Sequence, residues 1–234
     1  MRFQTPLIPA RLIRRYKRFL ADIELEDGSQ VTAHCPNPGS MLGLSQPGTK
    51  IWVEPNNDPH KKLKYGWHLV EHDNGHFTGI NAGSANKIVK EALIGREIKD
   101  LDTFSTCRPE VKYGKSSRID FLLSSSINNV PDTFVEVKSV TLMRQFGLAE
   151  FPDSVTGRGL KHLEELSKIA KSGKRAVLFF LVQRSDCTAF DIASDIDPAY
   201  GKAFQRFKLQ DIEVMVYSCA LSPDGIKIDK KLPV

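Results

Sequence analysis

The chain has 234 residues, of which 41% are apolar, and its 33 Lys and Arg against 28 Asp and Glu give a net charge of +5 at pH 7. Its 13 Phe, 2 Trp and 5 Tyr exclude a disordered composition, and no apolar run reaches the roughly 20 residues of a membrane-spanning helix. The first residues lack the apolar stretch of a secretory signal, so we expect a soluble cytoplasmic protein.

The first eighty residues have the period of β-strands. Apolar and polar residues alternate in short runs that end at Gly, Pro or Asn-Gly turns, among them the hairpin turn at Asp27-Gly28. These runs predict five strands, at residues 19–25, 31–35, 50–54, 67–72 and 76–80. Five short strands in this length predict a small barrel, for which the oligonucleotide-binding (OB) barrel is the natural candidate.

From about residue 81 the pattern changes. Helical spacing of apolar residues predicts helices at residues 84–95, with Ser84 as the cap, at 160–173 and at 198–208. Apolar runs predict strands at residues 110–113, 118–123, 133–140, 176–182 and 213–219. This order describes a mixed sheet with helices packed on it. We therefore expect a two-domain α+β protein, with an OB-like β-barrel over residues 1–80 and a mixed-sheet α/β domain over residues 81–234.

Two acids and one lysine lie among apolar residues of adjacent predicted strands. Asp120 is on one strand, and Glu136 and Lys138 are two residues apart on the next, so the latter two point to the same face. If the strands pair, two carboxylates come together, and burying them is costly unless a cation joins them. A divalent ion such as Mg²⁺ fits hard oxygen ligands, and Lys138 beside it would orient a water or a phosphate. The alternative is an ion pair between Glu136 and Lys138, since the pattern Glu-x-Lys occurs three times in this chain.

Two basic stretches indicate a polyanion as partner. The first contains five cations and no acid: Arg11, Arg14, Arg15, Lys17 and Arg18. The second, residues 60–68, mixes cations with Tyr65 and Trp67. Cations for phosphates and flat rings for bases are what a nucleic-acid surface requires. The alternatives are a solvated charged face beside core aromatics, or a sugar site in which Trp52, Trp67 and Tyr65 stack on a pyranose.

A further group of cations opens the second predicted helix. Arg158, Lys161 and His162 lie near its start, where the helix dipole disfavours positive charge. They fit there if a phosphate binds among them beside free backbone N–H groups, and Gly157 and Gly159 would allow the backbone to approach it. The alternative is a set of exposed helix charges.

Cysteines and hydroxyl groups give no sign of other chemistry. The four cysteines lie far apart without a C-x-x-C pair, so we expect buried reduced thiols: Cys35, Cys107, Cys187 and Cys219. Ser40 and Ser139 have no nucleophile-elbow sequence around them, and His34 is expected to be a strand histidine with satisfied hydrogen bonds.

Longer motifs make the chain resemble a known family. They are HCPNPGSM at residues 34–41, EVKYG at 110–114, SRIDF at 117–121, EVKSVTL at 136–142 and FPDSVTGRGLKHL at 151–163. Together they are similar to the sugar fermentation stimulation protein A family, over nearly the whole chain. The acids and the lysine, in the order helix, three strands, helix, strand, also resemble the PD-(D/E)xK superfamily of metal-dependent nucleases.

The resemblance implies an N-terminal OB-type barrel, a C-terminal restriction-endonuclease-like domain and DNA binding without sequence specificity. By the superfamily motif, Asp120 and Glu136 would be metal ligands for Mg²⁺ or Mn²⁺, with the carbonyl of Val137 as a third ligand. Lys138 would orient the attacking water. The roles of the three side chains would be catalytic.

Two more acids, Glu110 and Glu91, are candidates for the same site, because nucleases of this fold often recruit one there. The residue before Asp120 is Ile119 rather than the proline of the superfamily pattern, which is a common departure. We therefore predict a non-specific DNA-binding protein with a nuclease-like metal site for phosphodiester hydrolysis. The alternatives are a catalytically silent DNA-binding regulator of sugar use and a sugar-binding protein.

Overall fold

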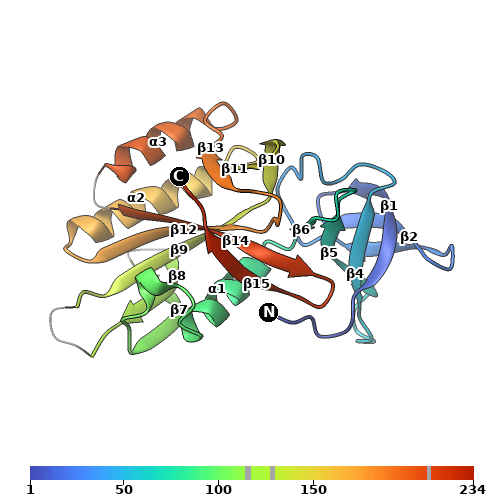
Figure 1. Ribbon diagram of the computed structural model, residues 1–234, viewed down its shortest axis with the longest axis horizontal. Coiled ribbons are helices and arrows are strands. Elements are labelled where there is room, and N and C mark those ends of the chain that lie inside the picture. The colour runs from blue at the N-terminus through green and yellow to red at the C-terminus, as the bar shows by residue number, and fades with distance from the viewer. Residues whose placement is uncertain (114–116, 127–129, 210–211) are drawn as a thin grey trace.

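The computed structural model of the chain describes residues 1–113, 117–126, 130–209 and 212–234. Figure 1 shows two lobes, a β-barrel formed by the N-terminal third and a larger lobe in which helices cover both faces of a sheet. The chain passes from one lobe to the other just after β6 (Phe77–Gly79). The predicted fold class, an OB barrel followed by a mixed-sheet α/β domain, is confirmed.

The barrel sheet has the strand order β3-β2-β1-β4-β5-β6. Its strands before β6 are β1 (Ile8–Tyr16), β2 (Leu20–Leu25), β3 (Gln30–His34), β4 (Lys50–Pro55) and β5 (Tyr65–Glu71). His34 of β3 pairs with Gly66 of β5, and this bridge closes β1 to β5 into a barrel. Alternate side chains point inward, and Leu12, Ile23 and Trp67 are fully buried in its core.

Strand β1 is absent from the sequence-based prediction. Three arginines occupy it, so its charge conceals the short apolar side that Ala10 and Leu12 bury. The register with β2 also shifts between Leu12 and Arg14, which interrupts the two-residue period.

The larger lobe is built on a six-stranded sheet with the order β15-β14-β12-β9-β8-β7. Its strands are β7 (Thr106–Tyr113), β8 (Ser117–Ser124), β9 (Thr133–Val140), β12 (Arg175–Val182), β14 (Ile212–Ser222) and β15 (Gly225–Lys231). The central strands β9, β12 and β14 are parallel and the outer pairs are antiparallel, so the sheet is mixed as predicted.

Helices cover both faces of this sheet (Figure 1). They are α1 (Ser84–Ile94), α2 (Gly157–Lys171) and α3 (Pro198–Lys208), with the short 3₁₀ helix η1 (Lys99–Leu101) after α1. All three predicted helices are present, but the predicted cap of α1 is wrong: Gly83 is the N-cap, no described side chain caps the helix, and Ser84 is the first helical residue. Among the described residues, no helix is both long and apolar enough to cross a membrane.

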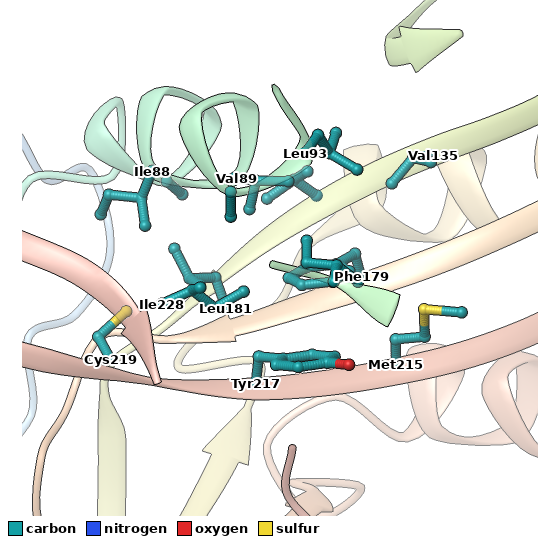
Figure 2. Close-up of a cluster of buried hydrophobic side chains, with 14 of the residues drawn as sticks. Ile88, Val89, Leu93, Val135, Phe179, Leu181, Met215, Tyr217, Cys219 and Ile228 are labelled. Atoms are coloured by element: carbon teal, nitrogen blue, oxygen red, sulfur yellow. The ribbon is translucent and has the colours of Figure 1, made fainter. Parts of the chain in front are cut away.

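Strand β12 contributes side chains to the hydrophobic cores on both faces of the sheet. Phe179 and Leu181 pack toward α1, where Ile88 and Val89 lie over them, and Tyr217 of β14 stacks on Phe179 with ring centroids 5.3 Å apart (Figure 2). Alternate residues of the strand, such as Phe180, pack on the other face with α2 and α3. A strand covered on both faces is apolar throughout, which is why the sequence predicts it well.

A small second sheet, absent from the prediction, flanks the larger lobe. It contains β10 (Leu142–Gln145), β11 (Leu148–Phe151) and β13 (Ala189–Ile192). Each strand has four residues, too short to show a period. Of the four free cysteines, Cys107 is half-buried and the others are buried, in line with the expectation.

The two lobes share a hydrophobic core and backbone hydrogen bonds. Leu69 of the barrel belongs to the same buried cluster as Phe179 of the larger lobe. The N–H of Gly79 donates to the carbonyl of Gln183 at 2.8 Å, and Thr78 forms a β-bridge with Arg184. A Cβ on Gly79 would lie 3.0 Å from Gln183 Oε1, so a larger residue there would push on the side chains of the other lobe. The lobes are therefore joined by packing, in addition to the connecting chain.

Candidate metal and nucleic-acid site

Asp120 lies where strands β8 and β9 part. The paired register of these antiparallel strands ends at Phe121 and Val135. One position further, Asp120 Oδ2 accepts the backbone N–H of Val137 at 2.7 Å, and its Oδ1 accepts Asn86 Nδ2 of α1 at 2.7 Å. The Asp120 carboxylate thus accepts the hydrogen bond of a backbone N–H at the point where β8 and β9 separate. The two hydrogen bonds together fix the position of this side chain.

Glu136 and Lys138 project from β9 to the same side of the sheet. Lys138 Nζ donates to Glu136 Oε1 at 2.8 Å, and the Nδ1 of His162 on α2 contacts the same oxygen. Glu136 is 2% exposed, and its other oxygen, Oε2, has no hydrogen-bond partner among the described residues. A buried carboxylate oxygen without a donor is costly, and a cation beside it would remove that cost.

The surroundings of the two acids shift their pKa values in opposite directions. Burial, and then the charge of Glu136, raise the pKa of Asp120 to about 6. Burial also acts to raise the pKa of Glu136, but the hydrogen bond from His162 and the charge of Lys138 outweigh it and hold that pKa below its ordinary value. At neutral pH the site therefore contains two ionised carboxylates, of which Asp120 is the less well compensated.

We expect the replacement of Asp120 by Asn to stabilise the metal-free protein at pH 7.5. The unfolded-state pKa is about 3.9, so ionising Asp120 in the folded state costs roughly 2–3 kcal/mol above pH 6, and this cost disappears as the pH falls toward 4. The amide oxygen still accepts the N–H of Val137. Urea unfolding in a chelator at pH 7.5 and 4.5 measures the difference.

Glu136→Gln is the matched control for that experiment. It should destabilise the protein at pH 7.5, because it leaves Lys138 without its carboxylate in a nearly buried position. Equal effects of the two substitutions, or a gain from Asp120→Asn that is the same at both pH values, would contradict this account of the charges.

Both acids line a cleft of about 1020 Å³ between the lobes. Arg18 and residues 37–39 of the barrel form one wall, and β9, α1 and the start of α2 contribute to the other. Among the described residues, the cations of the lining are Arg18, Arg118, Lys138, Arg158 and Lys161, and its carboxylates are Glu110, Asp120, Glu136, Glu150 and Asp153. With as many acids as cations, the cleft attracts a polyanion only weakly until further positive charge enters it.

Helix α2 begins in the wall of the cleft. Its N-cap is Thr156, whose Oγ1 accepts the N–H of Gly159 at 3.0 Å, so Arg158 lies in the first turn. Gly159 has a packing role, since a Cβ there would lie 2.8 Å from Thr156 Cγ2. A Cβ on Gly157 would meet nothing within 4 Å, so that position is open toward the cleft.

His162 lies among the carboxylates. The sequence-based prediction assigned it to a phosphate-binding surface, but its Nδ1 contacts Glu136 and lies 3.1 Å from Lys138 Nζ. Arg158 Nε donates to its Nε2 at 3.3 Å. Its ring thus uses Nδ1 toward Glu136 and Lys138 and Nε2 toward Arg158. His162 thereby connects the first turn of α2 to the acid site.

The five cations of the first basic stretch have different environments. Arg14 is paired with Asp22 at 2.8 Å, and Arg15 donates to the carbonyls of Asn37 and Gly39 and so holds the loop at the cleft wall. Arg11 donates to the carbonyl of Gly48, and Lys17 and Arg18 are exposed at the β1–β2 turn. Of these five cations, which the sequence predicts to contact nucleic acid, Arg18 lines the cleft and Arg15 holds the loop that forms part of its wall.

The aromatic residues of the barrel are mostly engaged inside the protein. Trp67 is 0% exposed and its Nε1 donates to the carbonyl of Leu69. Trp52 Nε1 donates to Glu71 at 2.7 Å, and Lys50 lies over its ring. The hypothesis that Trp67 stacks on a sugar is therefore wrong, because Trp67 is part of the barrel core.

Two of the motifs that carry the family resemblance meet at the cleft. Asn37 Nδ2 donates to the carbonyl of Ile80, its Oδ1 accepts the N–H of Gly39, and a Cβ on Gly39 would overlap the carboxylate of Asp153. The N–H of Met41 donates to Asp153 at 3.4 Å. The loop of the barrel is thus fitted against the segment that precedes α2.

The remaining predicted acids differ in position. Glu110 lines the cleft. Its neighbours in β7 on both sides pair with β8, and Glu110 itself has a left-handed φ of 53°. Glu91 instead pairs with the N-terminal amino group at 2.6 Å, and the α1 residue that reaches Asp120 is Asn86. Within the described ranges, no three His, Cys, Asp or Glu side chains gather as a metal site. Val137, whose carbonyl the family resemblance implies as a third ligand, lies between Glu136 and Lys138 on β9 and also lines the cleft.

Models of known protein families match the chain in both lobes. Residues 13–80 match the model described as SfsA N-terminal OB domain, and residues 83–225 match the model described as Sugar fermentation stimulation protein RE domain. The chain belongs to the sugar fermentation stimulation protein family. The resemblance predicted from the motifs is thus confirmed.

Relatives of the sugar fermentation stimulation protein family match over the full chain. A sugar fermentation stimulation protein homolog of Roseobacter denitrificans is 57% identical and covers 100% of this chain and 99% of its own. The homolog of Ruegeria pomeroyi is 60% identical over 97% of this chain and 98% of its own. A solved structure described as Pyrococcus furiosus SfsA in complex with Ca²⁺ has a TM-score of 0.88 and 25% identity, and covers 100% of this chain and 97% of that one.

Proposed function

We propose that the chain binds DNA without sequence specificity in the cleft between its lobes and hydrolyses phosphodiester bonds there with the help of Mg²⁺ or Mn²⁺. One observation carries the proposal: Asp120 and Glu136 line the same cleft, and Glu136 keeps a buried oxygen that has no partner among the described residues. The OB barrel that forms one wall of the cleft belongs to a class of folds that bind oligonucleotides, which supports a nucleic acid as ligand.

The donor set fits a hard divalent cation. Two carboxylates and a backbone carbonyl are oxygen ligands of the kind that Mg²⁺ and Mn²⁺ prefer. The relative from Pyrococcus furiosus, described as a complex with Ca²⁺, supports affinity of this family for such an ion. An ion held here would supply Lewis-acid polarisation of a phosphate oxygen and a more acidic water.

The protein side chains have separate roles in this proposal. Asp120 and Glu136 bind the cation at the point where β8 and β9 separate. Asn86 and the N–H of Val137 fix the orientation of Asp120. Lys138, tied to Glu136, orients the attacking water by donating a hydrogen bond. Arg158, in the first turn of α2, binds a phosphate beside free N–H groups.

The salt dependence of binding tests the DNA part of the proposal. Besides Lys138, the cations of the cleft are Arg18, Arg118, Arg158 and Lys161, and neutralising four phosphates gives a slope of log K against log salt of about −3 to −4. Arg158→Gln should make the slope less steep by about 0.7–0.9. Fluorescence anisotropy with Ca²⁺ present measures both. Lys227→Gln, an exposed cation of β15, is the control, and an equal loss from it would contradict binding in the cleft.

Titration calorimetry with Mn²⁺ tests the metal part. Wild-type protein should bind one ion at pH 7.5, and Glu136→Gln should weaken the affinity by about 100-fold, because a neutral amide replaces one of two charged ligands. Glu110→Gln, a cleft acid farther along β7, should have a smaller effect. No heat from the wild-type protein would reject the metal site while leaving DNA binding open.

A second function, a DNA-binding regulator without catalysis, is favoured by one observation. Glu136 Oε1 is already engaged by Lys138 and His162, so in this arrangement only its other oxygen is open to an ion. This function predicts full DNA binding by the wild-type protein and no cleavage with either ion.

A further inference from the structure

Three exposed apolar side chains belong to residues that line the cleft or that directly follow, in the chain, a residue in contact with it. Val155 is 75% exposed and lines the cleft itself. Phe19, 45% exposed, directly follows Arg18 of the cleft wall, and Leu42, 56% exposed, directly follows Met41, whose N–H donates to Asp153. We call these three side chains the apolar rim. Exposed apolar side chains close in the chain to a charged cleft offer apolar surface to a ligand with both polar and apolar parts.

The β1–β2 turn carries the cationic and aromatic parts of this surface at a cost in stability. Lys17 and Arg18 have φ angles of 48° and 61°, a left-handed conformation that favours Gly or Asn. The carbonyl of Phe19 accepts the N–H of Cys35, so the turn lies against the strand that leads into the loop at the cleft. Gly or Asn would suit these φ angles better, so Lys17 and Arg18 are not the residues that stability alone favours at this turn.

Other aromatic residues cannot offer a base a flat surface in the cleft. Trp67 is buried in the barrel, and Trp52 is held by Glu71 and Lys50. Phe151, the aromatic residue among the described cleft-lining residues, packs against Phe180 and Tyr200. Phe19 of the rim, in contrast, has a side chain that is 45% exposed.

We propose that the ligand of the cleft is single-stranded DNA, whose phosphates lie along Arg18, Arg158 and Lys161 while its bases contact the apolar rim. This inference rests on the proposed DNA-binding function and names its substrate class. The cations match the charge of the backbone, and the rim matches the apolar faces of bases that are free of a partner strand. In a duplex those faces are stacked inside the helix, so the rim would have no contact to make.

The test compares an oligo(dT) strand with an abasic strand of equal length and charge, both labelled for fluorescence anisotropy in the presence of Ca²⁺. Wild-type protein should bind oligo(dT) about tenfold more tightly than the abasic strand and than a duplex of the same length. The double variant Phe19→Ala and Leu42→Ala should lose this preference and keep its affinity for the abasic strand. Phe146→Ala, an 80% exposed aromatic between β10 and β11, is the matched control and should keep the preference.

The outcomes separate this inference from the function on which it rests. The base-contacting rim would be overturned if the wild-type protein and the rim variant bound oligo(dT) and the abasic strand with the same affinity. If Arg158→Gln still weakened that affinity, DNA binding in the cleft would stand. No binding of any strand at low salt would overturn both. Phe19→Trp, which keeps a flat ring, should restore or strengthen the preference for oligo(dT).

A variant of the β1–β2 turn provides a second, independent test of the proposal. Replacing Lys17 with Asn and Arg18 with Gly should raise the midpoint of urea unfolding, because both residues suit a left-handed φ. The same variant should bind oligo(dT) several-fold more weakly. A variant that gains stability and loses no affinity would show that the turn does not contact the strand.

Discussion

The double variant Asp120→Asn and Glu136→Gln is expected to lose Mn²⁺-dependent nicking of plasmid DNA by about 10³-fold or more, or roughly 4 kcal/mol in the activation free energy. Both substitutions keep the shape of the site, and the side-chain amide that replaces the carboxylate of Asp120 can still accept the N–H of Val137. What they remove is the negative charge that, in the proposed function, would hold a divalent ion beside the phosphate. Conversion of supercoiled to open-circular plasmid measures the rate.

Lys138→Gln gives a comparison that separates metal binding from the positioning of water. It should reduce nicking while Mn²⁺ still binds in calorimetry, because Lys138 contacts Glu136 and supplies no ligand of its own. Nicking that survives the double variant at the wild-type rate would reject this site as the catalytic centre. Absence of nicking by the wild-type protein, with DNA binding intact, would favour the catalytically silent regulator.

Asp186→Ala is expected to lower the free energy of unfolding by about 3–5 kcal/mol, because it leaves the buried guanidinium of Arg184 without its partner. Arg184 is 3% exposed, and its Nε and Nη2 donate to the two oxygens of Asp186 at 2.8 and 2.7 Å. Burial acts to raise the pKa of Asp186, but the hydrogen bonds and charge of Arg184 prevail and lower it. The pair therefore stabilises the fold above about pH 4, and this contribution is lost on acidification.

Urea unfolding at pH 7 measures the effect of Asp186→Ala, with Asp224→Ala, an exposed acid in the β14–β15 turn, as the control that should change stability by less than about 0.5 kcal/mol. Replacing both partners, Arg184→Met with Asp186→Leu, should cost much less than Asp186→Ala alone, because no charge is left buried without a partner. An equal cost for the single and the double change would contradict the role of the unpaired guanidinium.

The sequence predicted most of the larger lobe and about half of the geometry of the site. Strand β12 and helix α2 were predictable because their apolar patterns are set by burial on two faces and on one face respectively. Strand β1 was not, because its arginines conceal the period. Glu136 and Lys138 could be placed on one face from their spacing alone, and the structure shows them hydrogen-bonded.

The partners that come from other elements could not be predicted from spacing. Asn86 reaches Asp120 from a helix 34 positions earlier, and His162 reaches Glu136 from one 26 positions later. Which residue of a helix meets a strand depends on how the two elements cross, which a local pattern does not specify. The expectation that Glu91 would join the acids failed for this reason, since another side of α1 faces Asp120.

The shared core between the barrel and the larger lobe has a consequence for the cleft between them. Leu69 and Phe179 lie in one buried cluster, and Gly79 is hydrogen-bonded to Gln183, so swinging the lobes apart would expose apolar surface and break backbone contacts together. These contacts therefore oppose a hinge motion that would widen the cleft. A DNA strand, if the proposed function holds, would therefore have to enter the cleft without the lobes moving apart.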